Sequence, residues 1–334
     1  MRLSYIAAPL AALLLLAGCG SAPAPSPEPA AAGPVTAPSS LPEGMGSRDA
    51  DGVFPRTVTH FGGTTTIPAA PRRIVAVATG QLDGLLALDV MPVGTARASG
   101  AQLVPAYLPA AFPQRAAELG ALTDVGSRTA PQPESIAAAK PDLILANKAS
   151  SEKLYPQLSA IAPTVLTEGT GVNWKQDLLL LGAALGRSGA AQGLIDDEVR
   201  RAQDLGRRAG PVTVSLLRIQ PDRVRIFGVP SFVGSIAADA GLPRPPSQQF
   251  AKTSRDIGPE ELAQADAQYL FYGEQKAKPG APLPELLRTG LGPSLRAVRD
   301  KHAVAVDDDV WYLNAGPVAA RRVLDDMAKA LPGG

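Results

Sequence analysis

Short runs of β-branched and aliphatic residues alternate along the chain with segments of helical periodicity. The run Arg73-Ile-Val-Ala-Val-Ala78 predicts a buried strand, and the residues 142–146 predict another. Further strands are predicted at 92–96 and 163–166, and helices at 82–88, 133–139, 155–161 and 174–185. Strands that alternate with helices in this way are typical of an α/β chain with largely parallel sheets.

The segment 188–208 has a different pattern, in which apolar residues recur at helical spacing and charges occupy the other positions. The residues predicted to share its apolar side are Leu194, Ile195, Val199, Ala202 and Leu205. About 20 residues give a helix of roughly 30 Å, which is long enough to join two small domains. The α/β pattern then starts again, with strands predicted at 212–219, 224–227, 268–272, 303–306 and 310–313, and helices at 232–240, from 258, and at 318–331.

The first residues have the pattern of an export signal. Arg2 precedes an apolar run at 6–16, which is shorter than the roughly 20 residues that a membrane span needs. The tetrapeptide Leu16-Ala17-Gly18-Cys19 resembles the bacterial lipobox, which predicts cleavage before Cys19 and acylation of its thiol. The alternative is an ordinary signal peptide with an incidental cysteine. Since Cys19 is the only cysteine, lipidation excludes a disulfide, a cysteine nucleophile and a thiolate metal site in the mature protein.

The composition predicts a tether after Cys19 and argues against nucleic acid as a partner. Proline, alanine and serine dominate the residues after Cys19, which predicts a disordered or extended linker. The chain has 32 Lys plus Arg and 31 Asp plus Glu, and it has no basic run, so nucleic acid is disfavoured as a partner. The predicted organisation is a signal peptide at 1–18, a tether at 19–55, an N-terminal α/β lobe at 56–187, an inter-lobe helix at 188–209 and a C-terminal α/β lobe at 210–334.

Three stretches resemble the substrate-binding lipoproteins of iron-siderophore and cobalamin ABC importers. They are Gln132-Pro-Glu-Ser-Ile-Ala-Ala-Ala-Lys-Pro-Asp-Leu-Ile-Leu145, Gly258-Pro-Glu-Glu-Leu262 with the residues to Phe271, and Asp309-Val-Trp-Tyr-Leu-Asn-Ala-Gly-Pro317 with the helix that follows it. The resemblance implies two α/β lobes joined by a single long helix, as in class III periplasmic binding proteins. It also implies a monomer that binds a ferric siderophore between the lobes, needs no cofactor, and delivers the ligand to an ABC permease with its separate ATPase subunit.

The same resemblance gives Glu134 and Glu260 a role. In this family one glutamate on each lobe docks into arginine-containing pockets of the permease, and these two residues occupy the matching positions. Their positions alone favour another interpretation, because a carboxylate in the first turn of a helix is stabilised by the helix dipole. Glu261 is an adjacent candidate for docking.

We expect the ligand site in the cleft, at the loops that follow strand ends. A ferric siderophore is a bulky and often anionic chelate, so arginines and aromatic faces suit it. Arg97 and Arg218 are the favoured contacts because they follow or occupy strands, although a solvated surface charge is an equal alternative for any one arginine. Phe227 and Tyr272 could equally belong to the core. The expected ligand-binding residues are Thr79, Gln81, Arg97, Arg128, Asn147, Lys148, Trp174, Arg218, Phe227, Ser231, Phe232, Tyr272, Trp311 and Tyr312.

Other functions leave weaker signals. A direct metal site is disfavoured because the chain has only two histidines, of which His60 lies near the tether and His302 follows Asp300 and Lys301 in a predicted surface turn. Haem and cobalamin remain alternative ligands, with Tyr107, Tyr155, Tyr272 and Tyr312 as the tyrosines that could ligate haem iron. For an enzyme, Ser150-Ser-Glu-Lys153 fits the serine-x-x-lysine pattern of penicillin-interacting acylases, but the companion lysine-threonine-glycine motif is absent. A sensor, scavenger or adhesive lipoprotein is a further alternative, and the sequence names neither the siderophore class nor the membrane.

Overall fold

The computed structural model of the protein describes residues 37–98, 101–169, 171–275 and 281–333. The described residues form one compact unit. The predicted signal peptide and the lipidation site Cys19 lie outside the described residues. Within these ranges, no helix combines the length and the apolar character needed to cross a membrane.

The first lobe is built on a six-stranded sheet with the order β6-β5-β4-β3-β7-β8, in which only β6 runs antiparallel to its neighbour. Every residue of β3 and β7 is buried, because both faces of a parallel sheet are covered. The strands are β3 (Ile74–Ala76), β4 (Gly94–Arg97), β5 (Thr123–Ser127), β6 (Ala130–Pro131), β7 (Leu143–Asn147) and β8 (Thr164–Thr167). The helices are α1 (Gln81–Ala87), α2 (Tyr107–Ala111), α3 (Ala116–Gly120), α4 (Pro133–Ala138), α5 (Lys148–Ser151), α6 (Tyr155–Ile161) and α7 (Trp174–Leu185).

A hairpin of β1 (Arg56–His60) and β2 (Gly63–Ile67) precedes this sheet. The sequence analysis did not predict it, although its alternating residues flank a turn at Phe61 and Gly62. The residues before it also differ from the expectation. Gln176 donates a hydrogen bond to the carbonyl oxygen of Ser40, and the carboxylate of Asp51 accepts the N–H groups of Ser188 and Gly189. The part of the predicted tether from 37 to 55 is therefore packed against the lobe, and the boundary at 55 is wrong.

The second lobe has a mixed five-stranded sheet with the order β11-β10-β9-β12-β13. A hairpin joins β9 and β10, and this makes the β11 side of the sheet antiparallel while β9, β12 and β13 are parallel. The strands are β9 (Val214–Gln220), β10 (Arg223–Phe227), β11 (Ser254–Ile257), β12 (Tyr269–Glu274) and β13 (Ala303–Val306). The helices are α9 (Phe232–Asp239), α10 (Glu285–Arg288), α11 (Arg296–Arg299) and α12 (Pro317–Ala330), and the segment predicted as a helix from 258 is a 3₁₀ helix, η5 (Pro259–Ala265).

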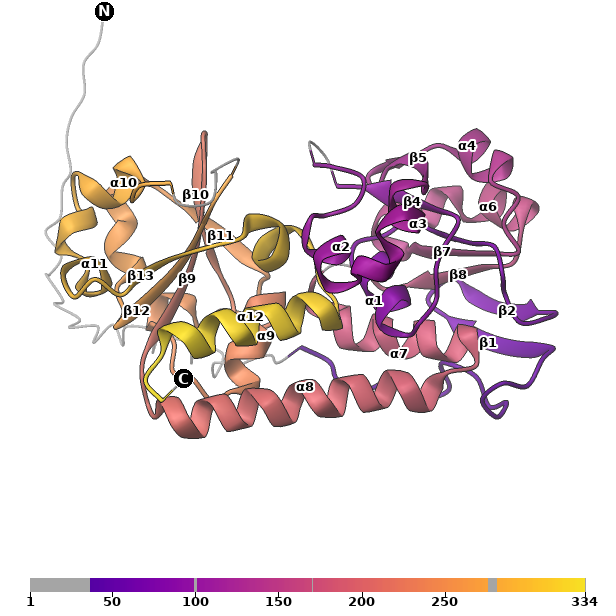
Figure 1. Ribbon diagram of the computed structural model, residues 1–334, viewed down its shortest axis with the longest axis horizontal. Coiled ribbons are helices and arrows are strands. Elements are labelled where there is room, and N and C mark those ends of the chain that lie inside the picture. Colours follow the sequence, from indigo (N-terminus) through magenta and orange to yellow (C-terminus); the bar gives the residue numbers. More distant parts are fainter. Residues whose placement is uncertain (1–36, 99–100, 170, 276–280, 334) are drawn as a thin grey trace, which may run out of the picture. The chain divides into compact units, whose positions relative to one another are not determined.

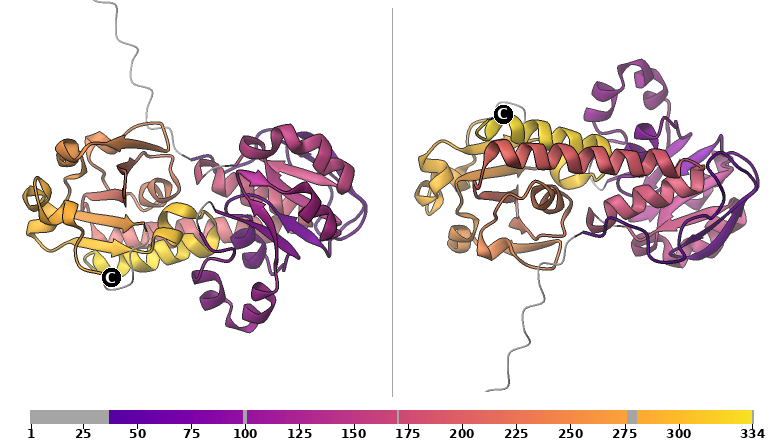
Figure 2. Two further views of the ribbon diagram at one scale, coloured as in Figure 1. Left: turned by 90° about the horizontal axis from the view of Figure 1, so that it is seen from above. Right: turned by 90° about the horizontal axis from the view of Figure 1, so that it is seen from below.

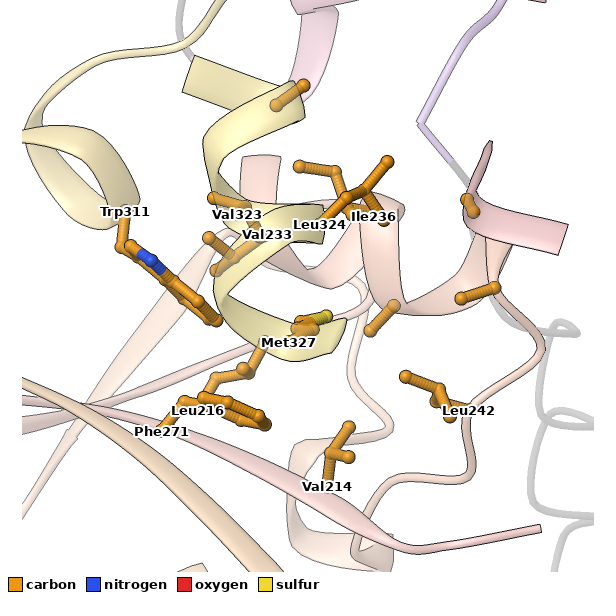
Figure 3. Close-up of a cluster of buried hydrophobic side chains, with 14 of the residues drawn as sticks. Val214, Leu216, Val233, Ile236, Leu242, Phe271, Trp311, Val323, Leu324 and Met327 are labelled. Carbon is orange, nitrogen blue, oxygen red and sulfur yellow. The ribbon is translucent and has the colours of Figure 1, made fainter. Parts of the chain in front are cut away.

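The segment predicted as a strand at 310–313 is instead a π-helical turn, Asp309–Leu313. Its apolar residues turn inward rather than alternating, because Trp311 packs into the core between the sheet and α12 (Figure 3). There its indole ring stacks on Phe271 of β12, with 5.1 Å between ring centroids. Met327 of α12 and Leu216 of β9 belong to the same cluster. Burial of one large aromatic side chain has overridden the local strand preference.

The long helix α8 spans Ser188–Ala209 and runs beneath the sheets of both lobes (Figures 1 and 2). It packs against α7 of the first lobe and against α9 and α12 of the second. Of the predicted apolar side, Ile195, Ala202 and Leu205 are buried, while Leu194 and Val199 are partly buried. The predicted fold of two α/β lobes joined by one long helix is therefore confirmed.

A second connection joins the lobes beside α8. The carboxylate of Asp83 on α1 accepts hydrogen bonds from the N–H groups of Val318 and Ala319 at the start of α12, each at 2.9 Å. Asp83 is 1% exposed, and the hydroxyl of Tyr107 donates a third bond to it at 2.8 Å. The backbones meet so closely that a Cβ atom at Gly316 would lie 2.4 Å from the same carboxylate. A side chain of the first lobe therefore caps a helix of the second.

Candidate ligand-binding cleft

A cavity of about 400 Å³ lies between the two lobes. Its size is within the range of small-molecule sites. Among the described residues, its lining contains hydroxyl and amide side chains, aromatic rings and one charged side chain, with no carboxylate. The lining residues are Thr79, Arg128, Thr129, Asn147, Ala149, Ser150, Gly171, Phe227, Ser231, Phe232, Val233, Thr253, Trp311, Tyr312, Leu313, Asn314 and Ala315.

The first-lobe side of the cavity is formed where strands end. Thr79 follows β3, Arg128 follows β5, and Asn147 ends β7. Since the carboxyl ends of parallel strands meet at one edge of a sheet, residues distant in sequence converge there. Asn147 also begins α5, because its Oδ1 accepts the N–H of Ser150 at 2.8 Å and the Ser150 hydroxyl at 2.7 Å.

The Ser150 hydroxyl is thus part of a helix cap. Its described partners are Asn147 and Ser151, and no hydrogen bond joins it to Lys153 in the part of the chain that the structure describes. The arrangement lacks the serine–lysine hydrogen bond that activates an acylating serine. The motif in the sequence has a structural explanation.

Arg128 supplies the one charge in the cavity lining. Its Nη1 donates to the carbonyl oxygen of Leu313 at 2.8 Å, which joins the lobes at the cleft. Burial, together with the nearby Arg218 guanidinium, lowers the pKa of Arg128 from its usual value. A half-buried guanidinium held by a neutral carbonyl keeps N–H groups that can bind an anionic ligand oxygen.

The second-lobe side is an aromatic wall made by Phe227 and Tyr312. Their rings stack with centroids 4.5 Å apart, and the Tyr312 hydroxyl donates to the carbonyl oxygen of Phe271 at 3.0 Å. Burial raises the pKa of Tyr312 far above its usual value, so this phenol stays neutral. Beside the wall, Ser231 caps α9 by accepting the N–H of Gly234 at 3.0 Å. The aromatic rings are fixed before any ligand arrives.

The two tryptophans have different positions. Trp311 lines the cavity, although it is only 1% exposed. Trp174 does not line this cavity. Its indole Nε1 donates to the Ser235 hydroxyl at 3.0 Å, and its ring meets the edge of Phe232. Trp174 therefore joins the lobes beneath the cleft, where a buried indole finds its hydrogen-bond partner.

The two favoured arginines, Arg97 and Arg218, are not in the cavity lining. Arg97 forms an ion pair with Asp124. Arg218 is held by both oxygens of Asp308, at 2.6 and 2.7 Å, and it is 6% exposed. Each arginine lies on a strand, and the packing of that strand places its side chain beside a carboxylate. The sequence alone did not reveal these partners.

Three further expected residues also lie outside the cavity lining. Gln81 is buried, with its Oε1 accepting the N–H groups of Val77 and Ala78, so it fixes the turn before α1. Tyr272 packs in a separate apolar cluster of the second lobe. Lys148 begins α5 between two lining residues without lining the cavity itself. The expected residues that the structure does bring together there are Thr79, Arg128, Asn147, Phe227, Ser231, Phe232, Trp311 and Tyr312.

Several lining residues were not predicted. Thr253 gives no local signal, because it precedes the edge strand β11 and reaches the cleft only through a bond from the N–H of Gly228 to its carbonyl oxygen. Asn314 follows the π-helical turn, and its Nδ2 donates to the carbonyl oxygen of Asp309. Thr129 could have been inferred as the neighbour of Arg128. Thr253 is positioned by backbone pairing at the edge of the sheet, and Asn314 is positioned by the π-helical turn before it. Residue type alone does not indicate either position.

The candidate docking glutamates lie on the surface of separate lobes. Glu134 is exposed in the first turn of α4, and Glu260 is exposed in η5. Glu261 is engaged locally, since its Oε2 accepts the N–H of Gly258 at 3.0 Å and its Oε1 accepts Gln264 at 2.8 Å. Among the described residues no hydrogen bond or ion pair engages the side chains of Glu134 and Glu260, which distinguishes Glu260 from its neighbour.

Iron ligation by the protein has little support among the described residues. They contain no cluster of three or more histidine, cysteine or carboxylate side chains that could hold a metal ion. His60 bonds to the Thr65 hydroxyl through Nε2 at 2.9 Å, and burial lowers its pKa to about 4. Tyr107 is bonded to Asp83, which removes it as a ready ligand for haem iron.

The chain is similar to known binding proteins over most of its length. A family model described as periplasmic binding protein matches residues 74–310. The probable siderophore-binding lipoprotein YfiY of Bacillus subtilis (strain 168) is 35% identical over 287 residues, which cover 81% of this chain and 86% of that protein. The achromobactin-binding periplasmic protein of Dickeya dadantii (strain 3937) is 28% identical over 272 residues, covering 78% and 86%. The structure of Staphylococcus aureus SirA complexed with staphyloferrin B matches with a TM-score of 0.70 and 27% identity, covering 82% of this chain and 97% of that one.

Proposed function

Because this chain belongs to the periplasmic binding protein family, we propose that it is the extracytoplasmic substrate-binding lipoprotein of an ABC importer and that it binds a ferric siderophore between its lobes. The observation that carries the proposal is the cavity shared by both lobes, with Arg128 on one side and the Phe227–Tyr312 wall on the other. A guanidinium and flat aromatic faces suit a bulky chelate that presents anionic oxygens. The names of the relatives support the iron chelate as ligand.

The binding step follows from the fixed cleft. Trp174, Asp83 and Arg128 each form a hydrogen bond from the first lobe to the second. Lys175 of α7 also forms an ion pair with Asp239 of α9. The ligand therefore enters a largely preformed site, and little binding energy is used to order the protein. Arg128 would bind anionic oxygens of the chelate while the aromatic wall contacts its apolar part.

Delivery and anchoring complete the proposal. Glu134 and Glu260 would dock to cationic pockets of a permease, one from each lobe, and their separation on rigid lobes would report the orientation of the lobes. Acylated Cys19 would hold the protein at the extracytoplasmic face of a membrane through the linker. ATP hydrolysis would belong to a separate subunit, and this chain would act as a carrier rather than an enzyme.

We expect a siderophore rather than haem. Haem binding would need an axial ligand, and the Tyr312 hydroxyl is bonded to the carbonyl oxygen of Phe271 while Tyr155 lies against His60. Neither tyrosine offers a free phenolate at the cavity.

The test is titration calorimetry of the purified protein with iron(III) complexes of catecholate, hydroxamate and citrate type, and with haem and cobalamin. Tight binding of one ferric chelate class supports the proposal, and binding of haem or cobalamin alone would refute it. Arg128→Gln should weaken binding by about tenfold to a hundredfold, since a charge-assisted hydrogen bond is lost. Arg97→Gln is the matched control, because Arg97 lies outside the cavity lining and should leave affinity unchanged. Equal loss in both variants would contradict the assigned site.

A further inference from the structure

Arg244 is a buried cation without a counter-ion. It lies in the segment between α9 and β11 and is 8% exposed. Its Nη2 donates to the carbonyl oxygen of Phe227 and to Oε1 of Gln248, both at 2.5 Å. Its Nε and Nη1 are buried without a hydrogen-bond partner, and no carboxylate of the described residues forms an ion pair with it. Only neutral oxygens hold this guanidinium.

Such an arrangement is costly, because a buried charge is normally paired. The neighbouring groups are themselves committed to the fold. Gln248 accepts the N–H of Leu216 and donates to the Ser215 hydroxyl, so it holds Arg244 in a fixed place on the sheet. Burial lowers the pKa of Arg244 to about 10, which still leaves the side chain charged at neutral pH. The charge is therefore present in the interior of the second lobe.

The position of this charge is directly behind the aromatic wall of the cavity. Arg244 bonds to the backbone of Phe227, and Phe227 and its stacking partner Tyr312 both line the cavity. Arg244 is 8% exposed, so the field of its guanidinium is less screened than that of a surface charge. The net field of Arg218 is smaller, because Asp308 holds its guanidinium through two hydrogen bonds.

We propose that Arg244 is a specificity-determining residue, which selects chelates with a net negative charge at the face that meets the Phe227–Tyr312 wall. The proposal rests on the proposed function and narrows its ligand class to anionic chelates. Arg128 contacts the ligand directly, whereas Arg244 acts through the wall without touching it. The cavity lining contains no carboxylate that would oppose these two charges.

The test compares Arg244→Gln, which removes the charge, with Arg244→Lys, which keeps it. The probes are an anionic iron(III) tris-catecholate and a neutral iron(III) trihydroxamate, titrated against each purified protein. A unit charge about 10 Å away in a medium of effective dielectric constant about 20 changes affinity on the order of tenfold per ligand charge. Arg244→Gln should therefore weaken binding of the tris-catecholate by at least tenfold more than binding of the trihydroxamate. Arg244→Lys should restore most of the lost affinity for the tris-catecholate.

Arg225→Gln is the matched control, because Arg225 lies two residues before Phe227 on β10 but is neutralised by Asp256 at 2.7 and 3.1 Å. It should leave both affinities unchanged. An equal loss of affinity for both probes in Arg244→Gln would mean that Arg244 only supports the wall. Unchanged affinity for the tris-catecholate in this variant would mean that the field of Arg244 does not reach the ligand. Either result overturns the proposal.

A separate readout distinguishes this inference from the function on which it rests. If the wild type binds none of the iron chelates, the proposed function fails, and the charge effect is then measured with citrate alone as the probe. Thermal stabilisation by citrate that is lost in Arg244→Gln and kept in Arg244→Lys supports the role of Arg244. Absence of citrate stabilisation in the wild type would overturn it.

Discussion

Replacing Asp83 by asparagine changes the charge at the contact between the lobes while nearly keeping the shape of the side chain. Asp83 is fully enclosed and accepts three hydrogen bonds, from Val318, Ala319 and Tyr107. The bonds favour the carboxylate, but burial disfavours it more strongly and raises its pKa to about 6 from 3.8. The ionised form is therefore tolerated less well in the folded protein than in the unfolded chain.

The sign of the pH effect follows from linkage. Because the folded pKa lies above the unfolded one, the unfolded chain releases this proton first as pH rises. The contribution of Asp83 to the free energy of unfolding is then present below pH 4 and is lost as pH rises through 6. A pKa about two pH units higher corresponds to about 3 kcal/mol. Asparagine carries no titrating proton, so the variant should lack this loss.

The assay is urea unfolding of the wild type and Asp83→Asn at pH 4 and at pH 7.5. The asparagine amide nitrogen cannot accept a hydrogen bond as the second carboxyl oxygen does, and this lost bond should cost about 1 to 2 kcal/mol at both pH values. From pH 4 to pH 7.5, the free energy of unfolding of the variant should rise by about 3 kcal/mol relative to that of the wild type. Tyr107→Phe is the control that removes one bond but keeps the carboxyl group, and it should retain the pH dependence. A difference that stays constant with pH, or that favours the wild type at pH 7.5, would refute the reasoning.

Three further predictions concern the lobe contact and the surface. Gly80→Ala should destabilise the protein by at least about 3 kcal/mol, because Gly80 has φ +78° and a Cβ there would lie 1.7 Å from a backbone oxygen of the second lobe; a thermal midpoint equal to the wild type would contradict this. Trp174→Phe should cost about 1 kcal/mol through loss of the indole hydrogen bond, with ferric chelate affinity preserved in calorimetry, and a large loss of affinity would return Trp174 to the ligand site. Charge reversal at both Glu134 and Glu260 should abolish uptake in a transport assay while sparing ligand binding, and normal uptake would exclude them from docking.

The strands and long helices were predictable because each depends on a local apolar pattern. The helix at 174–185 and the strand at 303–306 have the predicted bounds. The strand predicted at 310–313 failed because Trp311 is satisfied by stacking on Phe271, a contact between segments 40 residues apart. Sequence spacing carries no information about such a partner.

The candidate site was predictable where strand ends determine it. Thr79, Arg128 and Asn147 follow or end strands of one parallel sheet, so their convergence follows from the fold class. The arginines could not be ranked, since their value as ligands depends on what else contacts them. Arg97 and Arg218 are paired with carboxylates, whereas Arg128 is held by a neutral carbonyl group.

The sequence by itself determined the alternation of most strands and helices, the long helix 188–209 and the cleft edge, because hydrophobic periodicity and strand-to-loop transitions are local properties. Only the tertiary structure decided which charges are neutralised and which remain available. Asp83 caps a helix 235 residues away, and Arg244 lies behind the aromatic wall without a counter-ion. The physical reason is that the effect of a charge depends on its burial and on its neighbours in space, and both are set only when the two lobes have packed together.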